Sequence, residues 1–272
     1  MLYIKIDKME VNSSFLKNKI FIDSPNKNIV PISTTIDKNG NLSIANCSIN
    51  NLIERYGSPI YLLDEMTLRS SCRAYKSALK KYYPGKSLPI YASKANSSLF
   101  MSNLIHSEGL GLDAVSEGEL LTALNGGVDH KKIVFHGNNK SNREIEFAMR
   151  NKIKIVVDNS FDLERLITFS ESLNTTQEVM VRFTPGIECH THEYIKTGSV
   201  DSKFGFGIEN LEVVFRKIKE SKNVKLVGLH AHIGSQIFEL DPHNDLAEIM
   251  VKVALEAQKF GHIITELNLG GG

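Results

Sequence analysis

The feature that most constrains this chain is a regular alternation of short β-rich runs with longer helical runs, which begins near residue 89 and continues to the end. The β-rich runs are residues 89–92, 111–115, 133–136, 154–157, 178–183, 224–230 and 266–269. The helical runs between them are residues 97–107, 117–125, 142–150, 161–173, 211–220 and 245–260. Strict alternation of strands and helices predicts a parallel sheet whose outer side is covered by helices.

This pattern sets the expected fold class. The predicted strands number about seven, whereas a closed (β/α) barrel of the TIM type needs eight. We therefore expect an α/β fold that is an incomplete (β/α)8 barrel of about seven units. A sheet that stops one unit short leaves two strand edges without a neighbour, so we also expect the chain to be part of a longer protein.

The first third of the chain follows a different pattern. Residues 1–50 are rich in Asn, Ser, Lys and Ile, and the turn-forming residues 38–41 predict a β-hairpin after a loose arm. Residues 60–63 are predicted as a short strand and residues 66–82 as an amphipathic helix. We expect a division into an N-terminal arm and β segment, residues 1–50, and an incomplete barrel, residues 51–272.

Composition excludes several classes of partner. The formal net charge is +1, which gives no electrostatic footprint for nucleic acid or for an anionic membrane surface. Charged residues interrupt the first twelve positions, so they lack the apolar region of a secretory signal, and no apolar run approaches the length of a membrane span. Three cysteines at irregular spacing argue against a disulfide framework. We expect a cytoplasmic protein without nucleic-acid or membrane partners.

Unusual polar residues stand where the predicted strands end. In a barrel the carboxyl ends of the strands and the loops after them carry the functional groups. These positions hold Lys94, Asp113, His136, Arg182, His230 and His232. A run of three glycines, 270–272, follows the seventh strand.

The lysine and the glycines together indicate one kind of chemistry. A lysine at the end of a buried strand is costly unless the reaction needs a neutral amine, so Lys94 is a candidate nucleophile. Glycines 270–272 let backbone N–H groups approach a phosphate, and barrel phosphate sites lie in this part of the fold. A lysine and a phosphate cradle suggest a phosphorylated aldehyde held as an imine, which is pyridoxal phosphate (PLP). Taken alone, Lys94 is also compatible with an ordinary loop lysine.

Several motifs carry a family resemblance. The segment YASKAN, residues 91–96, resembles the PLP-lysine motif of alanine racemase-like barrel enzymes and their decarboxylase relatives. GLDAVSEGE, residues 111–119, is similar to the second-strand motif of that family, and HIGS, residues 232–235, to its ring-stacking and phosphate-binding motif. HTHEYI, residues 190–195, Thr197-Gly198 and DSKFG, residues 201–205, resemble the diaminopimelate decarboxylase branch in particular.

The resemblance implies roles for individual residues. Lys94, in a segment that includes Ala92, would carry the cofactor, and His232 would lie against one face of its ring. The phosphate would be held by Ser235, Gly270, Gly271 and Gly272. Asp113 and Arg182 would orient the ring and its substituents. Without the family context, Asp113 fits a strand-end carboxylate and Arg182 a barrel salt bridge equally well.

The resemblance also implies an activity. It is PLP-dependent decarboxylation of meso-2,6-diaminopimelate to L-lysine, by a homodimer with shared active sites and with no metal. The family also has a Glu-Pro-Gly-Arg segment, an eighth strand and a C-terminal β domain, which residues 1–272 do not contain. We therefore expect the chain as given to be inactive by itself and to fold poorly.

Three other interpretations stay open. A metal-dependent hydrolase is suggested by the pairs His190/His192 and His230/His232, because residues i and i+2 on a strand face the same side. A non-catalytic PLP-binding relative would keep Lys94 without turnover. Ornithine, arginine and carboxynorspermidine decarboxylases share the PLP residues, so the choice of substrate rests on the resemblance of residues 190–198.

Overall fold

A computed structural model describes residues 29–187 and 203–271 of the chain. The chain separates into two compact units, Met1–Ser87 and Leu88–Gly272. The division near residue 50 stays a prediction. Among the described residues, no helix is both long and apolar enough to cross a membrane.

The first unit contains the predicted hairpin. Strands β1 (Thr34–Ile36) and β2 (Leu42–Ile44) pair antiparallel, and β3 (Cys47–Ser48) pairs with β2. The turn is closed by the Asp37 carboxylate, which accepts hydrogen bonds from the backbone N–H groups of Asn39 and Asn41 at 2.8 and 2.9 Å. Short polar side chains that bond to the following backbone favour such turns, as the sequence predicted.

Two helices follow the hairpin. The predicted helix at 66–82 is α2 (Glu65–Tyr82), whose first turn is capped by the Asp64 side chain accepting from the Thr67 N–H. A further helix, α1 (Ile49–Tyr56), was not expected. The strand predicted at residues 60–63 is wrong, because this segment has no strand partner and Tyr61 is 97% exposed. An extended run of β-prone residues forms a strand only when a neighbour accepts its backbone hydrogen bonds.

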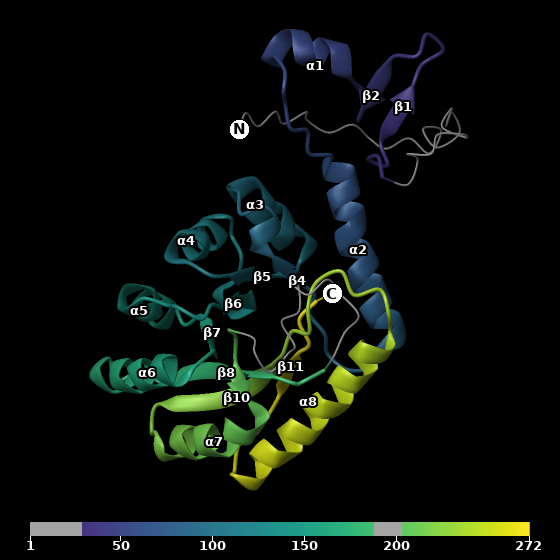
Figure 1. The fold of residues 1–272 in the computed structure, drawn as a ribbon. Coiled ribbons are helices and arrows are strands. Elements are labelled where there is room, and N and C mark those ends of the chain that lie inside the picture. Colours follow the sequence, from purple (N-terminus) through teal and green to yellow (C-terminus); the bar gives the residue numbers. More distant parts are fainter. Residues whose placement is uncertain (1–28, 188–202, 272) are drawn as a thin grey trace. The chain divides into compact units, whose positions relative to one another are not determined.

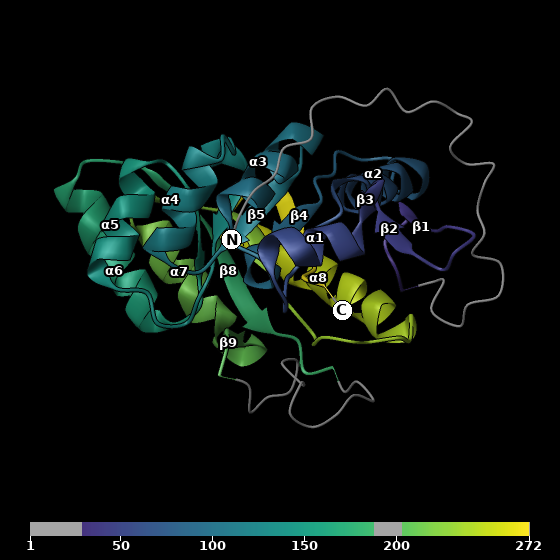
Figure 2. The same cartoon turned by 90° about the horizontal axis from the view of Figure 1, so that it is seen from above.

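The second unit is built around a parallel sheet. Its strand order is β11-β10-β8-β7-β6-β5-β4, and every neighbouring pair is parallel. The strands are β4 (Ile90–Ala92), β5 (Gly111–Ala114), β6 (Ile133–Phe135), β7 (Lys154–Val157), β8 (Gln177–Thr184), β10 (Val224–His230) and β11 (Glu266–Asn268). They form a curled sheet of seven strands, which confirms the incomplete α/β barrel. A two-residue strand, β9 (Phe206–Gly207), adds to the end of β8, as Figure 2 shows.

Helices connect the strands and lie on the outer side of the sheet (Figure 1). They are α3 (Leu99–Glu108), α4 (Glu117–Asn125), α5 (Asn142–Arg150), α6 (Ser160–Ser172), α7 (Leu211–Glu220) and α8 (Asp241–Lys259). Four of them begin at a polar residue whose side chain accepts a hydrogen bond from the first turn: Ser98, Ser116, Ser141 and Asn159. Each cap satisfies an otherwise unpaired N–H group, so the chain turns sharply from strand end to helix.

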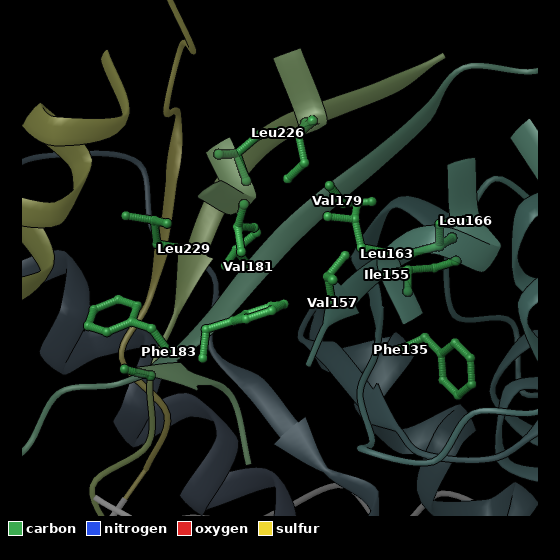
Figure 3. Packing of buried hydrophobic residues seen from close by; sticks show 14 of the residues in the cluster. Phe135, Ile155, Val157, Leu163, Leu166, Val179, Val181, Phe183, Leu226 and Leu229 are labelled. Atoms are coloured by element: carbon green, nitrogen blue, oxygen red, sulfur yellow. The ribbon is translucent and has the colours of Figure 1, made fainter. Parts of the chain in front are cut away.

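The hydrophobic core lies between the sheet and these helices. Alternate strand residues such as Phe135, Ile155 and Val181 belong to one buried cluster with Leu163 and Leu166 of α6, and Figure 3 shows Ile155 beside these two leucines. The other face carries a small apolar cluster of Val134, Val156 and Met180 with Ile90 packed against it. Because side chains alternate between the two faces, the strand positions two residues after this inner cluster also point inward.

Candidate functional site

The inward-facing positions become polar where the strands end. The register pairs Ala92 with Asp113 across β4 and β5, and it pairs Arg182 with His230 across β8 and β10. His136 and Asp158 stand two residues after the inward-facing Val134 and Val156 and complete the same edge. The full series is Ala92, Asp113, His136, Asp158, Arg182, His230 and Asn268. The carboxyl edge of the sheet therefore concentrates charge and hydrogen-bonding groups.

Lys94 stands at this edge, in the single 3₁₀ turn Ser93–Ala95 that follows β4. Its side chain is exposed, whereas Ala92, one of the predicted cofactor residues, is half-buried in the strand. The positive charge of Lys94 contributes to lowering the pKa of His232. Lys94 and His232 therefore lie close enough to interact electrostatically, although 138 positions separate them in the sequence.

Asp113 meets a histidine from the neighbouring strand. The Nε2 atom of His136 lies 2.9 Å from Oδ1 of Asp113. Neither atom has a hydrogen-bond partner among the described residues. The His136 ring also packs edge-on against His230, with ring centroids 4.7 Å apart.

Arg182 is buried in β8, and its guanidinium Nη1 lies 3.8 Å from Oδ1 of Asp158. Burial lowers the pKa of Arg182, and the carboxylates of Asp158 and Asp113 oppose that effect. Burial likewise raises the pKa of Asp158, opposed by a backbone hydrogen bond from Gly205 and by the charge of Arg182. The pair is a buried contact between opposite charges in which each charge stabilises the other.

His232 meets the glycine loop that follows β11. Its Nδ1 accepts a hydrogen bond from the backbone N–H of Gly271 at 3.3 Å. Burial, followed by the positive charges of Arg182 and Lys94, lowers the pKa of His232 to about 4. The ring is therefore neutral near pH 7, with its proton on Nε2, because Nδ1 acts as acceptor.

The backbone at Gly270 leaves no room for a side chain. Its φ is +72°, and a Cβ placed there would lie 2.8 Å from the carbonyl oxygen of Ala231 and 2.8 Å from Nδ1 of His232. A Cβ at Gly271 would instead meet no atom within 4 Å. The two glycines thus differ in their surroundings. The fold itself requires a glycine at position 270, where the backbone contacts are close, whereas the space beside Gly271 is empty.

His230 links two neighbouring strands at the same edge of the sheet. It is 4% exposed, and its Nδ1 contacts the carbonyl oxygen of Asn268 at 3.1 Å. Burial, then the charges of His136 and Arg182, lowers its pKa well below the usual value. The neutral ring therefore carries its proton on Nδ1 and donates it to Asn268.

The remaining predicted positions are placed only in part. Ser235 is half-buried in the loop after β10, three residues beyond His232. Gly272 and the segment 190–198, including His190 and His192, lie outside the described residues. In the described ranges, no group of three or more His, Cys, Asp or Glu side chains is arranged to hold a metal ion.

Two further buried groups support this edge and were not predicted as site residues. One is Asp158, which directly follows β7, so the strand-end rule applied to Lys94 and Asp113 would also have found it. The other is Lys140, which is 2% exposed and donates a hydrogen bond to Asp162 at 2.8 Å. Arg165 pairs with the same carboxylate at 2.8 Å. Burial lowers the pKa of Lys140, and Asp162 opposes that effect.

Comparison with known proteins supplies the family. Residues 66–272 match the family model described as pyridoxal-dependent decarboxylase, pyridoxal binding domain. The chain belongs to this family. A diaminopimelate decarboxylase of Synechocystis sp. is 48% identical over 92% of the chain, which spans 55% of that relative. The corresponding enzyme of Bacillus subtilis is 40% identical over 87% of the chain and is spanned to 54%.

Solved structures agree with the family. The crystal structure of a diaminopimelate decarboxylase from M. jannaschii superimposes with a TM-score of 0.81 at 32% identity, covering 88% of this chain and 56% of that one. A Helicobacter pylori diaminopimelate decarboxylase complexed with L-lysine gives a TM-score of 0.76 at 32% identity, covering 82% and 56%. The chain thus spans little more than half the length of the relatives that it matches.

The arrangement of the edge fits the cofactor of this family. PLP needs an amine, a flat neighbour for its ring and N–H groups near its phosphate. The exposed amine of Lys94 and the neutral imidazole of His232 supply the first two, and the open space beside Gly271 leaves room for a phosphate. The buried Oδ1 of Asp113 and Nε2 of His136, each without a hydrogen-bond partner among the described residues, are polar groups that a ligand would satisfy.

Proposed function

We propose that this protein is a PLP-dependent decarboxylase that converts meso-2,6-diaminopimelate to L-lysine. The observation that carries the proposal is the hydrogen bond of Gly271 to His232, beside the strand edge that also carries Lys94, in a chain of the pyridoxal-dependent decarboxylase family. The 48% identical relative is named a diaminopimelate decarboxylase, and the related Helicobacter pylori structure is complexed with L-lysine, the expected product.

The residues of the edge divide the work. The bound cofactor supplies an electron sink for the electron pair released when a substrate carboxylate leaves as CO2. Lys94 would hold the cofactor, and the neutral ring of His232 would lie beside it without adding a charge. Ser235 and the loop of Gly270, Gly271 and Gly272 would hold the phosphate, with the Ser235 hydroxyl as one donor. The N–H groups of Gly270 and Gly271 donate to Asn268 and His232 in this structure, so they would exchange these partners for the phosphate. Asp113 and Arg182 fix the orientation of the ring and its substituents.

The wider organisation of the protein is part of the same proposal. We expect a homodimer that shares its active sites, located in the cytoplasm. Cys47 and Cys72, the two cysteines among the described residues, are not joined in a disulfide, which suits a reducing compartment. Light scattering of the purified protein would test the dimer.

The substrate is tested by product formation. A full-length form of the protein, purified with added PLP, should release CO2 and L-lysine from meso-diaminopimelate, and its Lys94→Ala variant should not. Ornithine and arginine, tested in parallel, should give less than a hundredth of that rate. Preferential turnover of either would assign another basic amino acid to the site, and PLP binding without any turnover would indicate a non-catalytic relative.

A further inference from the structure

Asp158 combines burial with a carboxylate that is only partly satisfied. It follows β7, points to the inner side of the sheet and is 2% exposed. Oδ2 accepts a hydrogen bond from the Gly205 N–H at 3.2 Å. Oδ1 is buried, has no hydrogen-bond partner among the described residues, and lies 3.8 Å from the guanidinium of Arg182. Burying a carboxylate costs free energy unless an opposite charge or hydrogen bonds compensate for the lost water.

Arg182 is held on its other side by an aromatic ring. Its guanidinium carbon lies 4.4 Å from the centroid of the Phe204 ring, which is within the range of a cation–π contact. The side chain thus contacts Phe204 and faces the Asp158 carboxylate at ion-pair distance. Removing the Asp158 charge would leave the buried Arg182 cation with less electrostatic compensation. Breaking a buried ion pair in this way is strongly destabilising.

The turn that carries Phe204 is itself fixed to the end of the barrel. Thr184 donates its hydroxyl to the Phe204 carbonyl at 2.7 Å, and Asn138 donates its side-chain N–H to the Lys203 carbonyl at 3.1 Å. Gly205 has a φ of +78°, and a Cβ there would lie 3.1 Å from Cγ of Arg182. Asp158 therefore contacts both the turn, through Gly205, and the arginine that the turn covers.

The placement of Arg182 matters to the rest of the edge. Its charge is one of the causes that lower the pKa of His232 to about 4. A guanidinium that left this position would change both the charge beside His232 and the groups available to a ligand near Asp113. A side chain with several rotatable bonds holds such a position only when its partners restrict it.

We propose that Asp158 is a positioning residue, which holds the Arg182 guanidinium and the Phe204–Gly205 turn in the geometry that binds the cofactor. The proposal rests on the proposed function, because Arg182 is one of the residues expected to orient PLP. Asp158 itself does not need to touch the cofactor. It acts through Arg182, so its contribution should disappear when Arg182 is changed.

Two substitutions separate the charge of Asp158 from its hydrogen bond. Asp158→Asn removes the charge but keeps an oxygen that can accept from Gly205, whereas Asp158→Ala removes both. Glu178→Gln is the matched control, because Glu178 also lies 3.8 Å from a cation, Lys225, but both side chains are more than half exposed. Such an exposed pair contributes little.

The first measurement needs no cofactor. Hydrogen exchange of the Gly205 amide in the apo protein should speed up by about tenfold or more in Asp158→Ala, because the amide loses its acceptor. Asp158→Asn and Glu178→Gln should leave the exchange close to that of the parent. Equal exchange in all four proteins would show that Asp158 does not hold the turn, whether or not the protein binds PLP.

The second measurement is a double-mutant cycle on the dissociation constant of PLP. Asp158→Asn should weaken binding about tenfold in the parent protein, and it should have no further effect in an Arg182→Gln background. The same loss in both backgrounds would contradict an action through Arg182, and parent-like affinity of Asp158→Asn would remove the role altogether. Failure of the parent protein to bind PLP would instead reject the proposed function, while the Gly205 exchange would still decide the contact.

Discussion

Nε2 of His136 lies 2.9 Å from Oδ1 of Asp113, at the carboxyl ends of two neighbouring parallel strands. In the register of β5 and β6, Asp113 pairs with Val134, and His136 lies two residues after Val134. The contact between Asp113 and His136 therefore runs diagonally along the inner face of the sheet. Both atoms are buried, and neither has a hydrogen-bond partner among the described residues. Both residues were noted in the sequence as polar residues at strand ends, but their contact follows only from the fold.

Replacing His136 should therefore disturb the edge as well as the fold. We expect His136→Phe to lower the free energy of unfolding by about 1–3 kcal/mol, because the Asp113 oxygen loses its polar neighbour and stays buried. PLP affinity should fall as well, by about tenfold, since Asp113 is expected to orient the ring. Chemical denaturation and a PLP titration measure the two effects.

The chain offers a matched control for this substitution. His130 lies 3.4 Å from Asp129, but both side chains are more than a third exposed. His130→Phe should change neither stability nor PLP affinity appreciably, because water screens and solvates both groups. Equal effects at the two histidines would mean that the Asp113–His136 contact has no special role.

Lys94 should be the residue that carries the cofactor. Borohydride reduction of the PLP-loaded protein, followed by peptide mapping, should place the pyridoxyl group on Lys94. Lys140 is an unsuitable amine, because it is 2% exposed and hydrogen-bonded to Asp162. A label on Lys140 or on Lys203 would refute the assignment, and Lys94→Ala should abolish the label.

His232 should make stability depend on pH in acid. Its folded-state pKa of about 4 lies below the usual 6.5, so the unfolded chain binds a proton first as the pH falls. The free energy of unfolding should thus decrease as the pH falls from about 6.5 to about 4, and His230, whose pKa is also lowered, should add to the slope. Above about pH 6.5 neither histidine contributes to this slope.

The variant His232→Gln should flatten part of this dependence. Urea titrations of the parent and the variant at several pH values between 4 and 7 would measure it. An NMR titration that placed the His232 midpoint near 6.5 would contradict both the lowered pKa and the neutral ring.

Much of the fold was predictable because the βα units have strong local signals. The strands at 154–157 and 224–230 were predicted with the bounds that the structure has, as were the helices at 117–125, 142–150 and 211–220. Helix α8 begins at Asp241, four residues earlier than predicted, with a proline in its first turn. Proline is well accommodated there because the first N–H groups of a helix have no partner within it.

The strands that were predicted wrongly or missed are those whose formation depends on pairing with another strand rather than on local sequence. Residues 60–63 have β-prone side chains but no neighbouring strand, and β9 has only two residues and is defined by its pairing with β8. Helix α1 is a failure of another kind, because Ile49, Leu52, Ile53 and Tyr56 have the spacing of one helix face and this pattern was overlooked. The contact of His136 with Asp113 depends on register across the sheet, which the sequence of one strand does not contain.

The glycine loop after β11 offers a prediction that separates folding from cofactor binding. Gly270→Ala should destabilise the apo protein and weaken PLP binding, because its Cβ would lie 2.8 Å from both the Ala231 carbonyl and the His232 ring, at a φ of +72°. Gly271→Ala should leave the apo protein as stable as the parent, since nothing lies within 4 Å of the added carbon. It should still weaken PLP binding, because the carbon occupies the space expected for the phosphate.

Gly186 isolates the effect of backbone strain in this comparison. Its φ is +73°, nearly that of Gly270, but a Cβ there meets no atom within 4 Å. Gly186→Ala should cost about 1 kcal/mol from the backbone alone, so the excess loss in Gly270→Ala measures the clash with Ala231 and His232. Thermal denaturation of the apo proteins and PLP titrations of the same three variants provide the measurements. If Gly271→Ala bound PLP as tightly as the parent, the phosphate would have to lie elsewhere, and the assignment of the glycine loop would be wrong.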